Sequence, residues 1–508
     1  MAMIREQIDT QVLYEADVIV VGGGPGGIGA ALASARNGAK TILIERFGCL
    51  GGCQTLTFSN LFAFVDPRIQ GGIIQEIIDR LGQGGGIVVD CPDKVNRSGW
   101  GPEQGVHFFD GEYYKYLLDV MMKEAGVKVL FHSFAVAAIR EGNTLQGIVV
   151  ESRQGRFAVT AKVIIDCSGL GEIAWKSGAP VIGTEGFAEG ECKGQHMGYG
   201  YAYYASGIDV DRFRAHAAAH QAEWGEFSAG RSLITQAKAD GRVRLLRNSA
   251  LIRERIGGRA WILNPSYTLQ PGQHPWEVEA MTAGEIDLRR QARELHTLFR
   301  AEVPGFENSV IEQTPQQPLM RDGHRILGEH ILTENDIRHV KAFDDSIAVC
   351  NMPPDIFYPN GGHKFAYDIT PYDIPYRCLV STEVENLLAA GSSVSMDLTT
   401  WAAVRYNTPS VCTGQAAGTA AALAIRHNVA PKRLSVKMLQ ESLTSAGLRT
   451  AVRQLPDAVI KDYERRAGSD PSEDLTWLGR VEGSYAATAI GQCHPQLRRP
   501  RCRQGRVV

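Results

Sequence analysis

A glycine-rich turn constrains the fold of this chain more than any other feature of its sequence. Its residues are Gly22, Gly23, Gly24, Pro25, Gly26 and Gly27. The apolar run 17–21 before the turn predicts a buried parallel strand, and the alanine-rich stretch 28–37 after it predicts a helix. Gly22 permits the tight turn, Gly24 lets the backbone approach a pyrophosphate, and Gly27 allows close helix–strand packing. The helix N-terminus adds N–H groups and a positive dipole end, so the turn predicts a site for an anionic dinucleotide.

An acid closes the second predicted strand, residues 41–44. Glu45 follows Gly27 by eighteen residues, a position from which a carboxylate accepts hydrogen bonds from adenosine ribose hydroxyls. The same carboxylate repels a 2′-phosphate, which disfavours NADP. Strand, turn, helix, strand and acid in this order predict a Rossmann-type βαβ unit, and both FAD and NAD bind to such a unit.

Composition excludes several classes of protein. A chain of 508 residues is long enough for two or three domains, and a net charge of −3 gives no overall basic surface for nucleic acid. The ten cysteines lack the spacing of a zinc site or a secreted disulfide framework, which favours a cytoplasmic protein without a bound metal. We expect neither export nor a membrane contact, because no signal sequence precedes residue 17 and no run reaches the roughly 18 apolar residues of a spanning helix.

Later segments resemble those of the glutathione-reductase-like FAD flavoproteins. Several short strands are predicted between residues 127 and 165, and the stretch 161–169 resembles the return strand of these proteins. The strand end at 387–391 and a helix predicted over 414–426 resemble their C-terminal segment, which meets the ribityl chain and the flavin ring. The resemblance implies FAD as the cofactor. A helix N-terminus near the pyrimidine ring would stabilise the charge of the reduced flavin.

The chain is further identified as a member of the FAD-dependent oxidoreductase family, which is related to the fumarate reductase flavoproteins and to the flavin subunit of heterodisulfide reductases. The matching stretches are 50–55, 110–112, 161–169, 325–333, 372–379 and 405–422. The chain departs from the family pattern twice. Ser168-Gly169-Leu170 replaces a T-G-D triplet, and Arg321-Asp322 replaces an Arg-Glu pair on the substrate side.

The turn and the resemblance together imply a set of FAD-contacting residues. They are Gly22, Gly24, Pro25, Gly26, Gly27, Glu45, Arg46, Gly51, Gly52, Cys53, Thr55, Val136, Ser168, Gly169, Gly391, Gly414, Gln415 and Ala416.

The expected fold class is α/β. A discontinuous Rossmann-like FAD-binding domain, built from a parallel sheet and a β-meander, is predicted at 15–184 and 380–430. A second, α+β substrate domain is predicted at 185–379. Residues 431–508 are expected to form a helical extension that ends in a basic, disordered tail.

Catalytic candidates come from the histidines and arginines beyond the cofactor segments. His363, in a glycine-flanked loop, ranks first as the base that takes a proton from the substrate, and His324 ranks second. Arg405 precedes the predicted flavin-facing helix and is expected to hold a substrate carboxylate or to balance the reduced flavin. Cys49 and Cys53 form either a redox dithiol or, as we favour, small residues that pack near the cofactor. Four tyrosines line one pocket or pack in one sheet: Tyr199, Tyr201, Tyr203 and Tyr204.

The sequence therefore predicts an FAD-dependent dehydrogenase or oxidase. It would remove a hydride from a C–H bond beside oxygen or nitrogen in a small organic substrate and pass electrons to an external acceptor, since residues 180–380 contain no second dinucleotide-binding pattern. Two alternatives stay open, a reductase of an activated C=C bond and a flavin electron-transfer subunit. Monooxygenation is disfavoured because Ala390-Gly391-Ser392 stands where aromatic hydroxylases have Gly-Asp. A homo-oligomer also stays open.

Overall fold

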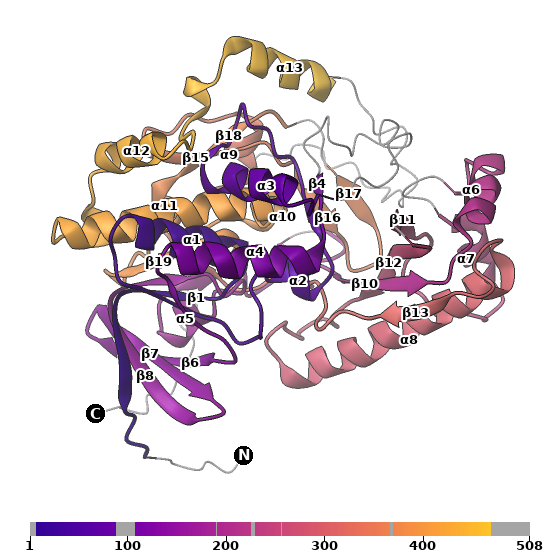
Figure 1. The fold of residues 1–508 in the computed structure, drawn as a ribbon, viewed down its shortest axis with the longest axis horizontal. Helices are drawn as coiled ribbons and strands as arrows, with labels where there is room; N and C mark the ends of the chain where they lie inside the picture. Colours follow the sequence, from indigo (N-terminus) through magenta and orange to yellow (C-terminus); the bar gives the residue numbers. More distant parts are fainter. Residues whose placement is uncertain are drawn as a thin grey trace.

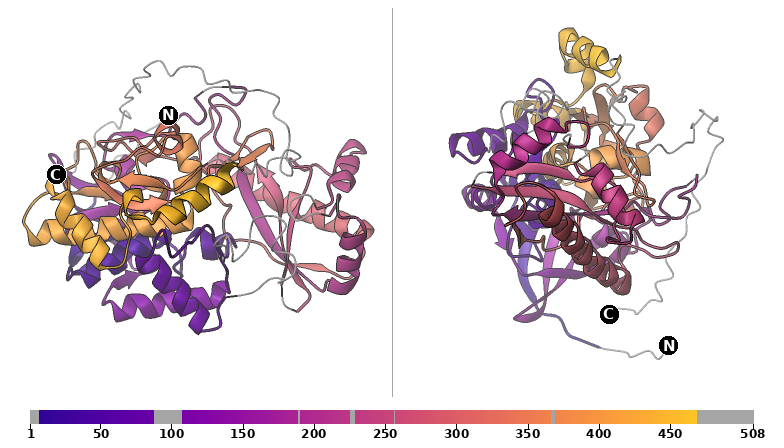
Figure 2. Two further views of the ribbon diagram at one scale, coloured as in Figure 1. Left: turned by 90° about the horizontal axis from the view of Figure 1, so that it is seen from above. Right: turned by 90° about the vertical axis from the view of Figure 1, so that its right-hand side faces the viewer.

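The structure, a computed structural model, describes residues 7–87, 107–188, 190–224, 229–255, 257–365 and 369–468. Two bodies lie side by side in it, a larger one around a seven-stranded sheet and a smaller one around a four-stranded sheet (Figure 1). Seen from above, the smaller body projects from one end of the larger one (Figure 2).

The sheet of the larger body has the strand order β5-β2-β1-β8-β7-β6, and β19 pairs with β8 off this path. Its strands are β1 (Val12–Val21), β2 (Thr41–Ile44), β5 (Lys128–Leu130), β6 (Phe134–Glu141), β7 (Thr144–Ser152), β8 (Gly155–Asp166) and β19 (Leu387–Ala389). β1, β2, β5, β8 and β19 pair in parallel, whereas β6, β7 and β8 form an antiparallel meander. This arrangement confirms the predicted α/β class with a Rossmann-like sheet and a meander. The two strands expected at 157–160 and 163–165 are one strand, because β1 pairs with β8 from Ala158 to Asp166.

The second half of strand β1, from Val18 to Val21, is apolar on both faces because both faces are covered. Val18 and Val20 belong to the core cluster that holds helices α1 (Pro25–Arg36) and α4 (Gly111–Glu124). Ile19 and Val21 belong to a second cluster, with residues of the meander and of α5 (Glu172–Lys176). The parallel part of the sheet is therefore the middle layer, with helices α1 and α4 on one face and residues of α5 and of the meander on the other.

Helix α11 (Asn407–Arg426) packs against α1 at unusually short distance. A Cβ atom on Gly414 would lie 2.1 Å from the carbonyl oxygen of Gly26, and one on Gly418 would lie 2.2 Å from that of Ala30. The prediction of a helix that begins at Gly414 is wrong, since α11 begins at Asn407. Gly414 lies inside the helix, where it serves the close contact of two helices rather than a helix N-terminus.

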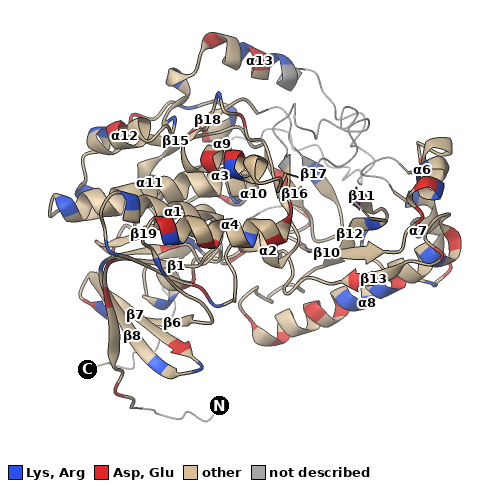
Figure 3. Ribbon diagram, in the orientation of Figure 1, with Lys and Arg blue, Asp and Glu red and all other residues tan. Residues whose placement is uncertain are grey.

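The smaller body is an antiparallel sheet of order β11-β12-β10-β13 with helices on one side. Its elements are β10 (Tyr199–Ser206), α6 (Val210–Ala219), α7 (Arg231–Ala239), β11 (Leu251–Arg255), β12 (Arg259–Tyr267), α8 (Val278–Glu302) and β13 (Val310–Gln313). Tyr201 and Tyr203 are buried in the core beneath α8, so the packed-sheet interpretation holds for them. Charged residues of both signs lie along α8 (Figure 3).

Shorter elements join the two bodies and cover the larger one. They are α2 (Cys53–Leu56), β3 (Leu61–Phe62), α3 (Gly72–Gln83), β4 (His107–Phe108), β9 (Val181–Ile182), β14 (Arg325–Ile326), α9 (Glu334–Arg338), β15 (Ser346–Cys350), β16 (Asp355–Phe357), β17 (His363–Phe365), β18 (Tyr372–Pro375), α10 (Leu398–Val404), α12 (Val436–Ser445) and α13 (Asp457–Gly468). Residues of β15 and β18 pack in the main core of the larger body. Helices α12 and α13 lie in the predicted helical extension, and its basic tail lies outside the described residues.

Two features are absent from the described residues. None of their helices combines the length and apolar character that crossing a lipid bilayer requires. No cluster of histidine, cysteine, aspartate and glutamate side chains among them is suited to hold a metal ion.

Candidate functional site

The glycine turn has the geometry that its sequence predicts. Gly22 has φ of +100°, and a Cβ atom there would lie 2.3 Å from the carbonyl oxygen of Cys167, so only glycine fits. Helix α1 then begins at Pro25 with Gly24 as its N-cap, and no side chain caps it. A Cβ atom on Gly24 would meet only the Cα atom of Gly52, at 3.8 Å. The uncapped N–H groups of α1 therefore face open space beside Gly24.

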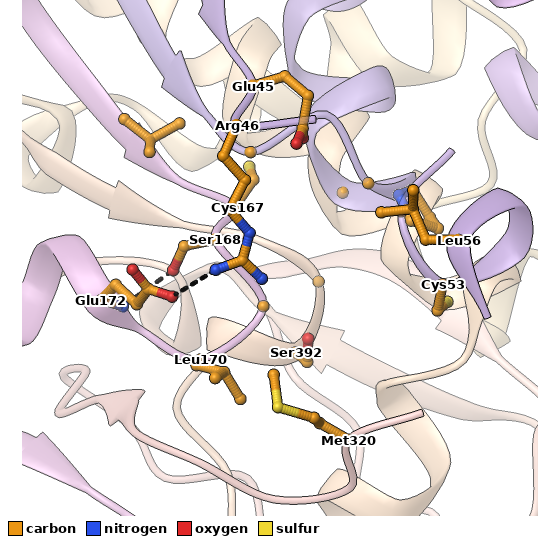
Figure 4. A pocket seen from close by; sticks show the side chains of 18 of the residues that line it. Glu45, Arg46, Cys53, Leu56, Cys167, Ser168, Leu170, Glu172, Met320 and Ser392 are labelled. Atoms are coloured by element: carbon orange, nitrogen blue, oxygen red, sulfur yellow. Dashed lines mark hydrogen bonds and ion pairs between the residues drawn. The ribbon is translucent and has the colours of Figure 1, made fainter. Parts of the chain in front are cut away.

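A large pocket begins at this turn. It has about 1150 Å³ of empty space, its mouth included, and lies where the ends of β1, β2, β8 and β19 meet. Figure 4 shows labelled side chains around the cavity, most of them from α2, from α5 and from the segments that follow β2, β8 and β19. In an open α/β sheet, ligands bind outside the carboxyl ends of the parallel strands, and this pocket occupies that position.

Glu45 is held by the backbone of the turn that it faces. One carboxylate oxygen accepts a hydrogen bond of 2.6 Å from the amide of Gly23, and the other accepts one of 2.8 Å from the amide of Phe47. Burial raises the pKa of this carboxyl, although both hydrogen bonds act against the shift. Beside it, Arg46 lies 3.5 Å from Glu172 across the pocket (Figure 4).

Twelve of the predicted site residues line this pocket. They are Gly22, Gly24, Pro25, Gly26, Glu45, Arg46, Gly52, Cys53, Ser168, Gly169, Gly391 and Arg405. The structure thus brings together segments up to several hundred residues apart in the sequence.

The other predicted cofactor residues do not line the pocket. They are Gly27, Gly51, Thr55, Val136, Gly414, Gln415 and Ala416. Thr55 donates a hydrogen bond to the carbonyl of Leu50, and the side-chain carbonyl of Gln415 accepts one from the amide of Ile73. Thr55 and Gln415 therefore stabilise segments next to the pocket rather than line it.

One wall of the pocket was not predicted from the sequence. The segment 317–320 lines it, although it follows the last strand of the smaller body. Gly200 and Leu319 exchange backbone hydrogen bonds, which tie this segment to β10. Arg46 donates a hydrogen bond to Gln317 at 3.3 Å. Other lining residues that the sequence did not indicate include Leu56, Thr57, Phe134, Leu170, Ser392, Trp401 and Ser410.

Arg405, which lines the pocket, also belongs to a buried cluster of side chains around the carboxylate of Asp355. Asp355 accepts hydrogen bonds from His363 Nε2, from the hydroxyl of Tyr406 and, at 3.2 Å, from Arg405 Nη2. Paired strands β16 and β17 hold Asp355 and His363 together. Burial raises the pKa of Asp355, but its interactions with His363 and Arg405 outweigh burial and bring this pKa to about 2. Burial lowers the pKa of His363 and raises that of Tyr406.

His324, the second candidate, belongs to a different cluster. Its ring stacks on Trp276 with 3.9 Å between ring centroids, and burial lowers its pKa to about 4. Nearby, His196 bonds to Asp322 at 2.8 Å. Neither His324 nor His363 lines the pocket, whereas Arg405 does.

The two cysteines beside the turn are free thiols. Cys53 lines the pocket, and burial raises its pKa to about 11. Burial also raises the pKa of Cys49. Because the thiolate is the reactive form, these shifts favour packing over dithiol chemistry.

Comparison with models of known families gives one match over most of the chain. A family model described as FAD dependent oxidoreductase matches residues 17–443. Among curated proteins, a digeranylgeranylglycerophospholipid reductase from Methanocaldococcus jannaschii is 32% identical over 164 residues, which are 30% of this chain and 38% of that protein. A thiamine thiazole synthase from Methanococcus vannielii is 28% identical over 165 residues, 31% of this chain and 57% of that protein. The matched part thus spans well under two thirds of either relative.

Solved structures are similar over most of the chain but at low identity. A geranylgeranyl bacteriochlorophyll reductase-like protein from Thermoplasma acidophilum has a TM-score of 0.44 and 13% identity, with 92% of this chain and 100% of that chain covered. The p-nitrophenol 4-monooxygenase of Pseudomonas putida has a TM-score of 0.43 and 11% identity, with 91% and 92% covered.

Proposed function

The chain belongs to the FAD dependent oxidoreductase family and is an FAD-binding enzyme, and from this premise we propose that it is a dehydrogenase or oxidase. Its substrate is a small organic molecule with a C–H bond beside oxygen or nitrogen. The observation that carries the proposal is the cluster at the end of the pocket, where Asp355 accepts hydrogen bonds from His363, Tyr406 and Arg405.

The residues of the pocket fit FAD. The open side of Gly24 and the uncapped start of α1 suit the pyrophosphate, and Glu45 suits the adenosine ribose. We assign the ribityl chain to the strand ends that carry Ser168 and Gly391. Bound FAD supplies an acceptor for the two electrons and the hydrogen of a hydride.

In this proposal His363 removes the second hydrogen of the substrate as a proton. Asp355 accepts the hydrogen bond from Nε2, which keeps the proton of the neutral ring on that nitrogen and leaves the lone pair at Nδ1. Because burial lowers the pKa of His363, the ring is neutral near neutral pH. A neutral imidazole takes a proton from an O–H or N–H group, so this state favours oxidation of the substrate over reduction of a C=C bond.

Arg405 and Asp355 position the groups around the base. Arg405 lines the pocket, and its bond to Asp355 connects the pocket wall to the His363 ring. Tyr406 donates its proton to the same carboxylate and therefore does not compete for the substrate proton. We further propose an external electron acceptor and a cytoplasmic location, the latter supported by the seven free cysteines among the described residues.

Anaerobic mixing of the holoenzyme with a panel of alcohols and amines tests the proposal. Bleaching of the flavin absorbance by a member of the panel supports oxidation. If the panel leaves the flavin unchanged while an enoate reoxidises the dithionite-reduced enzyme, the protein is a C=C reductase. If the reduced flavin reacts only with another protein, it is an electron-transfer subunit. The His363→Gln variant should keep its flavin spectrum and lose most of its bleaching rate, with His339→Gln, at an exposed histidine that caps the C-terminus of α9, as the matched control.

A further inference from the structure

Three arginines lie near one another beside the pocket: Arg247 and Arg321 contact the ring of Phe357, and Arg405 is bonded to Asp355. We propose that this arginine cluster binds a carboxylate of the substrate, which makes the substrate a hydroxy acid or an amino acid. The inference rests on the proposed function, in which the oxidised C–H bond lies beside oxygen or nitrogen. It adds the anionic group and the residues that recognise it.

Arg321 occupies a place built for a guanidinium. Its side chain is 2% exposed, and its guanidinium carbon lies 3.6 Å from the centroid of the Phe357 ring. A Cβ atom on Gly200 would lie 2.4 Å from Arg321 Nη2, so a glycine in β10 leaves the room for it. Nη1 donates to the carbonyl of Gly198 at 2.9 Å, whereas the buried Nε has no hydrogen-bond partner among the described residues. The preceding residue, Met320, lines the pocket.

Arg405 is the member of the arginine cluster that lines the pocket. Its side chain is 9% exposed and lines the pocket, and Nη2 is bonded to Asp355. Its Nε is buried, and no described residue accepts a hydrogen bond from it. A carboxylate at this wall would accept from a guanidinium in the geometry that arginine and carboxylate share.

Arg247 adds a third positive charge near Phe357. Its guanidinium carbon lies 5.7 Å from the ring centroid, and within the described parts of the chain it forms no hydrogen bond or ion pair. Burial lowers its pKa to about 10, and the attraction of Asp355 offsets this only in part. Mutual repulsion adds to the effect of burial on Arg321, whose pKa falls to about 9.

The charges of this region are not balanced by the described residues. Three guanidinium groups share the single carboxylate of Asp355, which also accepts from His363, so two positive charges remain. An unpaired buried charge is costly, and a bound anion relieves that cost. The reduced flavin, with a negative charge at its pyrimidine side, accounts for one of the two. A substrate monocarboxylate accounts for the other, which is why we infer an organic acid rather than a neutral alcohol or amine.

Titration calorimetry on the oxidised holoenzyme tests the proposal without turnover. The probes are acetate, pyruvate and benzoate, each paired with its neutral amide, and inorganic phosphate. We expect at least one carboxylate to bind, with an affinity at least about tenfold above that of its amide. The inference is overturned if no carboxylate outbinds its amide, or if phosphate binds more tightly than every carboxylate.

Variants assign the binding to the cluster. Arg247→Gln should weaken binding of the carboxylate about tenfold or more and leave the amide unaffected. Arg244→Gln is the matched control, because Arg244 is exposed and pairs with Glu294 on the outer surface. Arg321→Lys, which keeps the charge and loses the planar fork, should also weaken binding, and it guards against a folding defect from a neutral side chain at this buried site. An Arg247→Gln variant that binds carboxylates as the parent does would refute the assignment.

The flavin offers the competing explanation for the cationic surplus. If the three arginines served only the reduced flavin, Arg247→Gln would lower the flavin midpoint potential and leave carboxylate affinity unchanged, and that result overturns the inference. We expect weaker anion binding, which a role for the flavin alone does not produce. The two proposals fail on different results. If carboxylate binding depends on Arg247 but no hydroxy or amino acid bleaches the flavin, the proposed function is wrong and the carboxylate site stands. If neutral alcohols or amines bleach the flavin but no carboxylate binds, the proposed function stands and the carboxylate site is wrong.

Discussion

The carboxylate of Glu45 accepts a hydrogen bond of 2.6 Å from the backbone amide of Gly23, in the middle of the glycine turn. The residue that suits the ribose therefore also fixes the turn that suits the pyrophosphate. A charged acceptor makes this bond stronger than a neutral one would. The turn and the acid are one unit in the structure, although eighteen residues separate Gly27 from Glu45 in the sequence.

This relationship predicts the effect of Glu45→Gln. The variant keeps the shape of the side chain and loses the charge, so the bond to Gly23 weakens and the turn loosens. We expect FAD affinity to fall about tenfold or more and the free energy of unfolding of the apoprotein to fall by about 1–3 kcal/mol.

Fluorescence titration with FAD and urea unfolding measure the two effects of Glu45→Gln. Glu76→Gln, in a surface pair with Arg36, is the control and should change neither. Wild-type FAD affinity in Glu45→Gln would refute the role of the acid.

The contact between α1 and α11 predicts a second effect. In Gly414→Ala the new methyl group meets the carbonyl oxygen of Gly26, where an ideal Cβ atom would lie at 2.1 Å. The helices must separate, and we expect a loss of about 1–3 kcal/mol in the free energy of unfolding. Because Gly26 belongs to the glycine turn, FAD affinity should fall as well.

A glycine in another helix supplies the matched control for this variant. Gly82, in α3, has no atom within 4 Å of an added Cβ and lacks a positive φ. Gly82→Ala should leave stability unchanged or raise it by about 0.5–1 kcal/mol. Equal stability of the two alanine variants in urea unfolding would contradict the proposed contact.

Local sequence was sufficient to predict the turn and the sheet. The signals for this unit lie within thirty residues of each other: the strand at 17–21, the helix after it and Glu45. They also indicate that β1 pairs with β2. The course of α11 was not predictable in this way. Glycine often marks the end of a helix, so Gly414 was interpreted as the start of a new one. In the structure Gly414 instead allows the close contact with α1, which no local sequence pattern reveals.

The site itself was predictable only in part, for the same physical reason. Arg405 and His363 were candidates by residue type, but the carboxylate that connects them, Asp355, lies on a short strand without a recognisable motif. The wall at 317–320 comes from the chain after the smaller body, and only tertiary structure brings it to the pocket. The assignment of individual residues to FAD stays a prediction.

The neutral state of His363 predicts the pH dependence of catalysis. A base acts in its unprotonated form, so kcat/KM should fall as pH decreases through the pKa of the free enzyme's base. Burial holds this pKa below the ordinary value of 6.5, although Asp355 opposes the shift. The acidic limb of the kcat/KM profile should therefore lie below pH 6.5 and should be absent from the residual activity of His363→Gln. An inflection above 6.5, or an unchanged limb in the variant, would rule out His363 as the base.

Asp355→Asn tests how the cluster works as a unit. An amide oxygen accepts a hydrogen bond but carries no charge, so the imidazole of His363 loses the partner that fixes its tautomer and Arg405 loses its counter-charge. We expect kcat to fall roughly a hundredfold or more, because the wrong tautomer presents no lone pair to the substrate. FAD content should stay near that of the parent, since Asp355 does not line the pocket.

Asp345→Asn is the control, because that residue pairs with Arg377 outside the site and its loss should leave kcat unchanged. The measurement is the anaerobic rate of flavin bleaching at saturating substrate in each holoenzyme. If Asp355→Asn bleaches as fast as Asp345→Asn, the carboxylate does not orient the base, and the proton must leave by a route that bypasses His363.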